Sequence, residues 1–203
     1  MRLVEKTRNP SKNDQITLKI SLIGSSPLIW RRIIVPVRLN LGKLHKIFQV
    51  TMGWTTSHLH EFRITGKRYM DQSYDDFAVD PEDRTLDQEK LTLLHIASKT
   101  DRFEYIYDFG DGWRHQIEIE NIQDLDPRLT LPICIGGENA CPPEDCGGLG
   151  GYADFLNKLS SQSSFDPDDP PDNDVLAWVG GYFNPSSFDP NRINIDHLWR
   201  KKW

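Results

Sequence analysis

Hydrophobic residues alternate with polar residues in several stretches of the chain, which is the pattern of half-buried β-strands. Residues 15–23 place four aliphatic side chains on one face: Ile16, Leu18, Ile20 and Leu22. A second β-rich run covers 28–35, and Pro36 closes it because proline cannot donate to a sheet. Alternation returns at 59–64, and 65–67 can turn the chain into a short strand through Tyr69. These runs predict an antiparallel sheet.

The most strongly patterned stretch is 105–120, YIYDFGDGWRHQIEIE. It predicts two strands joined by a glycine-rich turn, since Gly110 and Gly112 tolerate the backbone angles of a tight connection. The aromatic residues Phe103, Tyr105 and Tyr107 would share one face, with Ile117 and Ile119 across from them. This hairpin is expected to organise the rest of the fold.

Helical spacing appears in a few places. The apolar residues between Asn40, a suitable N-cap, and Gly53 predict a helix over about 41–52 packed on the sheet. Shorter helices are predicted at about 151–160 and 175–179, and 184–203 carries enough apolar residues to dock a last element. The expected fold class is α+β, with a mainly antiparallel sheet of five to seven strands, one packed helix at about 41–52 and C-terminal helices.

Other segments lack periodicity. Residues 1–13 are polar and predict a flexible N-terminal arm, followed by a single α+β domain over 14–203 with a helical C-terminal portion. Residues 71–90 are acidic and predict an exposed excursion. The string CIGGENACPPEDCGGLGG from Cys134 onward is rich in glycine and proline and is expected to form an ordered or metal-binding loop without regular structure.

The charge, the apolar content and the absence of common motifs exclude several classes of function. Thirty acidic against 24 basic side chains give a net charge of −6, which disfavours nucleic acid as a general partner. No apolar run approaches the roughly 20 residues that cross a bilayer, and no signal peptide begins the chain, so a cytoplasmic protein without membrane association is expected. No dinucleotide-binding, Walker A, nucleophile-elbow or H-E-x-x-H pattern occurs.

One group of residues has the chemistry of a metal site: His58, His60, Asp108, Asp111 and His115. Neutral imidazole with carboxylate is an ordinary ligand set for zinc, iron or manganese, and histidines two apart on a strand share a face. In the alternative interpretation the histidines belong to an aromatic sheet face, and the aspartates accept hydrogen bonds from turn amides.

The cysteines form a second group. Cys134, Cys141 and Cys146 are an odd number confined to one segment, which is not the pattern of a disulfide framework. Their spacing departs from that of common zinc loops, although His115 could complete a tetrahedral set. The alternative is that they are small buried apolar residues, with Glu144 and Asp145 anchoring the loop through backbone N–H groups. No cofactor is expected, and zinc is the candidate metal.

Several strings, taken together and in order, resemble one family. They are PLIWRRIIVP, GWTTSHLHEF, YDFGDGWRH and CPPEDCGGLGGYADF, and the similarity covers roughly 15–190. The chain resembles the plasmid pRiA4b ORF-3-like family, whose members are also described as TnpR-like passenger proteins of an insertion element. The resemblance implies no defined reaction, and the chain shows neither a serine-recombinase pattern nor an Arg-His-Arg-Tyr set.

The favoured interpretation is a non-catalytic interaction module that binds a protein or peptide. Its expected surface comprises the candidate residues His58, His60, Tyr107, Asp108, Asp111, Trp113 and His115. The alternative is a metal-dependent enzyme, with nucleic acid as a candidate substrate.

Overall fold

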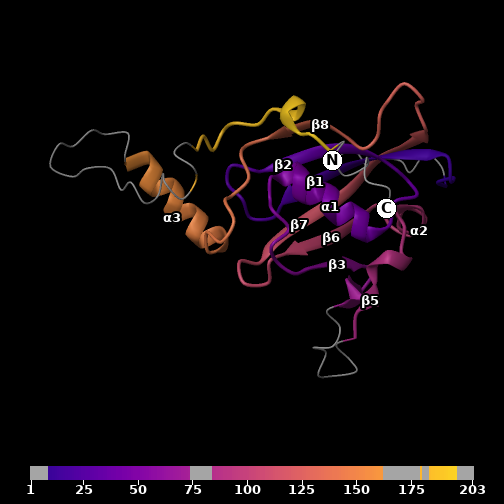
Figure 1. Ribbon diagram of the computed structural model, residues 1–203, viewed down its shortest axis with the longest axis horizontal. Helices are drawn as coiled ribbons and strands as arrows, with labels where there is room; N and C mark the ends of the chain where they lie inside the picture. The colour runs from indigo at the N-terminus through magenta and orange to yellow at the C-terminus, as the bar shows by residue number, and fades with distance from the viewer. Residues whose placement is uncertain (1–8, 74–83, 162–178, 180–182, 196–203) are drawn as a thin grey trace.

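The structure, a computed structural model, describes residues 9–73, 84–161, 179 and 183–195 (Figure 1). Within these residues the centre is a sheet of eight strands in the order β5-β4-β3-β6-β7-β1-β2-β8. The strands are β1 (Asp14–Leu22), β2 (Trp30–Pro36), β3 (His60–Ile64), β4 (Lys67–Met70), β5 (Leu86–Asp87), β6 (Arg102–Tyr107), β7 (Trp113–Asp124) and β8 (Ile133–Glu138). Only β4 and β5 pair in parallel. The mainly antiparallel α+β fold is confirmed, with eight strands rather than five to seven.

The helices of the described residues are α1 (Leu41–Met52), α2 (Leu93–Ala97) and α3 (Gly148–Ser161), with two 3-10 turns, η3 (Gln88–Lys90) and η4 (Pro190–Arg192). The first has the predicted bounds, and α3 starts at Gly148 rather than at 151. The helix predicted at 175–179 lies outside the described residues, apart from Val179. None of the described helices is long and apolar enough to cross a membrane.

Helix α1 begins after Asn40 and ends at Gly53, as the sequence predicts. The side chain of Asn40 accepts a hydrogen bond from Lys43 N at 3.0 Å, and Gly53 closes the helix in the left-handed region with φ 98. Its apolar side, with Leu44, Ile47 and Phe48 all at most 1% exposed, packs on one face of the sheet (Figure 1). The opposite face of the sheet is therefore left without this helix.

The central hairpin, formed by β6 and β7, has the predicted facing. Phe103 pairs with Ile117, Tyr105 with His115 and Tyr107 with Trp113 across the two strands. All six side chains are at most 3% exposed and lie on the face covered by α1. The hairpin aromatics are thus core residues rather than an exposed binding surface, which corrects the expected location of Tyr107, Trp113 and His115.

Two segments expected to be irregular contain strands. Residues Ile133–Glu138 pair with β2 as an edge strand, although they include the start of the glycine-rich string. The acidic stretch after Met70 contributes β5, which has only two residues, and 74–83 lie outside the described residues. At the N-terminus, residues 1–8 are likewise outside, whereas Lys12 and Asn13 are held by Arg38 and Leu125.

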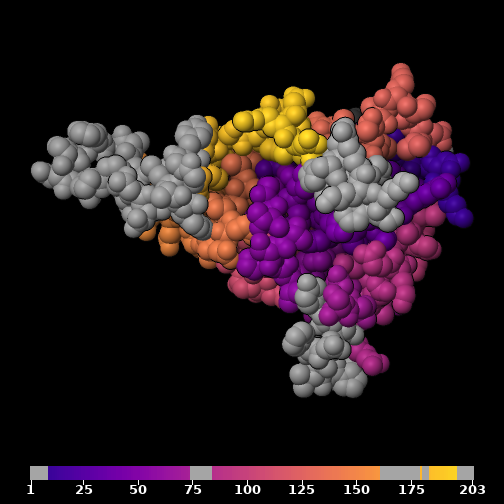
Figure 2. Space-filling view, viewed as in Figure 1, coloured from indigo at the N-terminus to yellow at the C-terminus, as the bar shows by residue number. Residues whose placement is uncertain are grey.

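The segment 183–195 lies along the outer side of β8, as the yellow atoms of Figure 2 show. Ala140 N donates to Pro185 O at 2.8 Å, and the ring of Phe188 stacks on the guanidinium of Arg31 at 3.8 Å. Arg31 is buried; its Nε donates to the carbonyl of Thr51, and its Nη1 donates to the carbonyls of Trp30 and Glu138. This arginine joins α1, β8 and the C-terminal segment.

Candidate functional site

The two histidines predicted to share a strand face are separated. His60 opens β3, is 8% exposed, and stacks on the ring of His45 with centroids 3.4 Å apart. Its Nε2 lies 2.8 Å from Gln88 Oε1, so it is a satisfied core residue. His58 precedes the strand, and its side chain is 29% exposed. Only His58 remains available for ligand chemistry.

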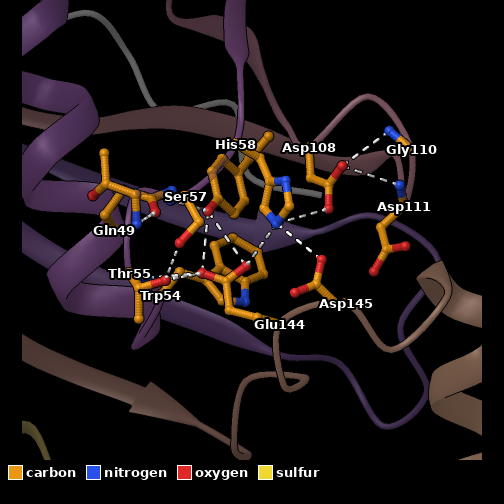
Figure 3. Close-up of polar contacts among 12 residues, drawn as sticks. Gln49, Trp54, Thr55, Ser57, His58, Asp108, Gly110, Asp111, Glu144 and Asp145 are labelled. Atoms are coloured by element: carbon orange, nitrogen blue, oxygen red, sulfur yellow. Dashed lines mark hydrogen bonds and ion pairs between the residues drawn. The ribbon is translucent and has the colours of Figure 1, made fainter.

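Three carboxylates surround His58 Nε2 (Figure 3). Asp145 Oδ1 is 3.0 Å away, Asp108 Oδ2 is 3.7 Å away and Glu144 Oε2 is 3.9 Å away. The Nε2 atom is buried and makes no hydrogen bond of acceptable geometry with any described residue. Three carboxylates therefore lie around one imidazole nitrogen, and none of the described residues forms a hydrogen bond with that nitrogen.

Asp108 is placed by the turn of the central hairpin. It follows β6 with φ 55, in the left-handed region, which aspartate tolerates better than most residues. One carboxylate oxygen, Oδ1, accepts from Gly110 N at 2.9 Å and Asp111 N at 3.3 Å. The other oxygen is thereby directed at His58, and the carboxylate is nearly buried.

Asp111, another predicted site residue, has a connecting role. Its Oδ2 accepts from Gly147 N at 3.1 Å, which ties the hairpin turn to the loop carrying Glu144 and Asp145. Gly148 approaches so closely that an added Cβ would come within 2.5 Å of Asp111 O. Asp111 thus holds the loop in place and is not one of the residues that converge on His58.

Glu144 is fixed by several donors. The hydroxyl of Tyr107 lies 3.1 Å from its Oε1 and itself accepts from Ser57 N at 3.1 Å. Thr55 N donates to the same oxygen at 2.7 Å. Burial, followed by the negative charge of Glu144, raises the pKa of Tyr107 well above its ordinary value. Tyr107 therefore acts as a neutral donor to the carboxylate.

The loop that carries these acids is anchored to the core. Trp54 Nε1 donates to Pro142 O at 3.1 Å, and the Trp54 ring packs against Tyr107 and Trp113 with centroids 5.0 and 6.0 Å away. The acids thus stand on a loop whose base is packed against aromatic residues.

His115 and Trp113 lie beneath the site and contribute no ligand to it. His115 is fully buried, and its Nδ1 donates to Tyr105 O at 3.2 Å. Burial lowers the pKa of His115 to about 4, so the ring is neutral near pH 7. Its Nε2 and Trp113 Nε1 have no hydrogen-bond partner among the described residues.

The cysteines are not gathered into a ligand set. Among the described residues, one group of three potential ligands lies close enough together to share an ion: His58, Asp108 and Asp145. This group contains no cysteine. The three thiols are free, and burial raises the pKa of each, to about 12 for Cys146. They pack in or against the core as small apolar side chains.

Backbone strain is concentrated around His58. Among the described residues, three of the non-glycine positions with positive φ are Thr56 at 62, Asp108 at 55 and Asp145 at 56. Such conformations cost free energy and persist where the surrounding structure imposes them. The carboxyl groups of Asp108 and Asp145 are aimed at His58 from these strained positions.

Comparison with known proteins gives the chain relatives without assigned functions. The model of the family described as plasmid pRiA4b ORF-3-like protein matches residues 14–194. The uncharacterized protein y4hQ of Sinorhizobium fredii is 34% identical over 189 residues, covering 90% of this chain and 88% of that protein. The crystal structure of a protein of unknown function, MM3350 from Methanosarcina mazei Go1, is similar with a TM-score of 0.76 at 31% identity, covering 91% of this chain and 100% of that one.

Proposed function

This chain belongs to the plasmid pRiA4b ORF-3-like family, and we propose that it binds a divalent metal ion through His58, Asp108 and Asp145 and is a metal-dependent hydrolase. The observation that carries the proposal is the buried His58 Nε2, which faces carboxylates at 3.0 and 3.7 Å without a hydrogen bond to either. An ion between these groups would satisfy all of them.

The spacing of the ligand atoms fits one ion. One atom from each of the three residues lies within 4.8 Å of the other two. Ligands bound at about 2.0–2.2 Å lie no more than about 4.4 Å apart, so a shift of a few tenths of an ångström completes the set. Imidazole with two carboxylates suits zinc or manganese better than calcium, which prefers oxygen ligands alone.

The charge around the site also favours a cation. Asp108, Glu144 and Asp145 form their ion pairs with His58, and no arginine or lysine of the described residues pairs with any of the three. Protonation of His58 would offset only one of three negative charges. A divalent ion would offset two and would leave Glu144, oriented by Tyr107 and Thr55, as a neighbouring acceptor.

The chemistry of such a centre follows from its open positions. Three protein ligands leave room for water, and a bound divalent ion makes that water a nucleophile near neutral pH. Glu144, whose Oε2 lies 3.9 Å from His58 Nε2, would be the residue placed to accept a proton there. The net charge of −6 argues against duplex DNA as the substrate, and the family's link to mobile elements and to TnpR-like proteins stays a hypothesis drawn from the resemblance.

The non-catalytic protein-binding or peptide-binding module is the competing candidate. One observation favours it: Leu59 and Phe109, which follow His58 and Asp108 in the sequence, are 39% and 47% exposed, and Asp108 N donates to Leu59 O. Under this hypothesis the carboxylates would receive a basic partner side chain in place of an ion.

Metal binding decides between the two. The protein, stripped with chelator, is titrated with Mn²⁺ and Zn²⁺ by calorimetry, and its metal content is measured after dialysis. We expect one ion per chain and a higher melting temperature with metal, because a ligand that binds only the folded state stabilises it. Asp108→Asn and Asp145→Asn should each weaken binding at least about tenfold, while Glu144→Gln should weaken it about 10- to 100-fold as an outer-shell partner.

Asparagine is suited to these tests because it tolerates the left-handed backbone that both aspartates adopt. Asp101→Asn, an exposed acid away from the site, is the control and should bind as the wild type does. Absence of binding at millimolar metal, or equal binding by wild type and Asp145→Asn, would contradict the proposal and favour the interaction module.

A further inference from the structure

The sheet face opposite α1 has a hollow of about 340 Å³. Five strand residues line it, Glu61, Arg63, Arg68, Ile106 and Arg114, together with Phe109 of the hairpin turn. Glu61 and Arg63 flank Phe62, whose ring points into the core on the other side. The hollow therefore lies on a different face from the inward-pointing ring of Tyr107, and it includes none of the residues that surround His58.

The hollow contains ion pairs between arginines and acids. The carboxylate of Glu61 is only 2% exposed, and it receives Arg63 Nε at 2.6 Å and Arg68 Nε at 2.7 Å. Two guanidinium groups thus share one buried acid. Arg114 donates to Glu104 at 3.2 Å.

The arginines are held in place but retain free donors. A guanidinium group has five N–H donors. Within the described residues Arg63 donates through Nε alone and Arg114 through one terminal nitrogen, and their side chains are 49% and 52% exposed. The remaining donors make no hydrogen bond within the described residues, and the half-exposed side chains that carry them are held by Glu61 and Glu104, an arrangement suited to an oxyanion.

The hollow also has an apolar part. Ile106 is 6% exposed and lies among the lining residues, and the Phe109 ring is 47% exposed beside the arginines. An exposed aromatic ring next to guanidinium groups offers a stacking surface for a flat group. We propose that this hollow is a second binding site, which takes a small organic oxyanion, phosphate or carboxylate, attached to a flat ring.

The proposal is tested by calorimetric or NMR titration in chelator with four probes: adenosine monophosphate, adenosine, inorganic phosphate and benzoate. We expect adenosine monophosphate to bind at least about tenfold more tightly than phosphate or adenosine, because tenfold corresponds to about 1.4 kcal/mol from the second contact. Comparison with benzoate shows whether phosphate or carboxylate is the preferred oxyanion.

Two variants test which residue contacts the oxyanion and which contacts the flat ring. Arg63→Gln should weaken adenosine monophosphate and phosphate alike, by about tenfold, since it removes a charged donor. Phe109→Ala changes an exposed side chain and should weaken adenosine monophosphate while leaving phosphate unchanged. Arg102→Gln, an ion-paired arginine at the start of β6 that does not line the hollow, is the matched control and should bind as the wild type does.

Asp145→Asn separates this inference from the proposed metal site, because it should weaken metal binding and leave adenosine monophosphate binding unchanged. Equal affinity of wild type and Arg63→Gln, or no binding of any probe up to about 10 mM, would overturn the proposal. An unchanged affinity for adenosine monophosphate in Phe109→Ala would overturn the assignment of the flat ring to Phe109.

Discussion

The hydroxyl of Tyr105 links the core of the protein to the candidate metal site. It lies 2.8 Å from His45 Nδ1 and accepts from Gln49 Nε2 at 2.9 Å. The other end of the same amide, Gln49 Oε1, accepts from Thr56 N at 2.9 Å, two residues before His58. A chain of hydrogen bonds, buried as far as Gln49, therefore runs from β6 to the loop that carries the proposed metal ligand.

This connection gives a prediction for Tyr105. Tyr105→Phe keeps the packing but leaves buried polar groups unpaired, so the free energy of unfolding should fall by about 1–3 kcal/mol. Tyr105→Ala should cost about 3–5 kcal/mol, because it also leaves a cavity. Denaturant unfolding measures both.

The control for Tyr105 is Tyr69→Phe on β4, whose half-buried hydroxyl makes no hydrogen bond with the described residues. It should change stability little. If Tyr105→Phe were as stable as the wild type, the hydrogen-bond chain would contribute nothing and the hairpin would not have the organising role assigned to it.

Individual residues were the hardest level to predict from sequence. His58 and Asp108 were recognised as candidates, and the structure brings them together. His60, Trp113 and His115 were misassigned to an exposed surface, because a buried histidine or tryptophan has the same sequence signature as a functional one. Asp145 had been interpreted as a loop anchor, since nothing periodic shows that this loop packs beside His58.

At the scale of elements, helix α3 begins with a close approach between the helix and the preceding loop. A Cβ added to Gly151 would lie 1.7 Å from Cys146 O, whereas one added to Gly150 would meet nothing within 4 Å. Glycine at 151 is therefore what allows the loop that carries Glu144 and Asp145 to fold back on the helix.

The two glycines make a matched pair of substitutions. Gly150→Ala should raise the free energy of unfolding by up to about 1 kcal/mol, because alanine is the better helix former at an exposed position. Gly151→Ala should lower it by about 1–3 kcal/mol, as expected of overpacking, and should weaken metal binding by displacing the neighbouring loop. Thermal melting and metal titration measure the two effects. Similar melting temperatures for both variants would show that the loop at Cys146 can move away from residue 151 at little cost in stability.

Strands and helices could be predicted from the sequence where a single local pattern, alternation or a capped helical repeat, specifies them. The alternation of β1, β6 and β7 and the capped helix α1 appear in the structure as predicted. By contrast, β8 was missed because Gly136 and Gly137 have no side chain to alternate, and its pairing with β2 supplies the order that local sequence lacks. At two residues, β5 is too short to produce any pattern.

At the scale of the whole molecule, burial of neutral histidines links stability to pH. Burial lowers the pKa of His45 to about 2 and of His115 to about 4, and it also lowers the pKa of His60. In the unfolded chain each imidazole has a pKa of about 6.5. Between about pH 6.5 and pH 4 the unfolded state therefore binds more protons, and the folded state loses stability as pH falls.

His45 and His115 should each contribute a slope of about 1.4 kcal/mol per pH unit over this range. We expect uptake of about two protons on unfolding at pH 5 from His45 and His115, and His60, whose pKa burial also lowers, should add to this number. Unfolding enthalpies measured in buffers of different ionisation heat give this number. A stability that is flat between pH 7 and pH 5 would show that these histidines are protonated in the folded protein.

The net charge of the whole molecule follows directly from the sequence. The weak affinity for duplex DNA that this charge implies stays a prediction, and so does a cytoplasmic location. The uneven distribution of charge is different, because it depends on the fold. The acids of the His58 site and the arginines beside Phe109 lie on different sides of the central hairpin, and only the strand register shows this.

The edge formed by β8 bears on how this protein avoids aggregation. A sheet with an open, regular edge can recruit strands from other molecules. Along β8 the ring of Phe188 lies so close to Gly137 that even a methyl group would not fit, and η4 covers the strand from the outside. At the other edge, β5 offers only two residues for pairing. Within the described residues, the sheet is therefore self-limiting: one edge is occupied by the chain's own later residues, and the other is too short to serve as a template.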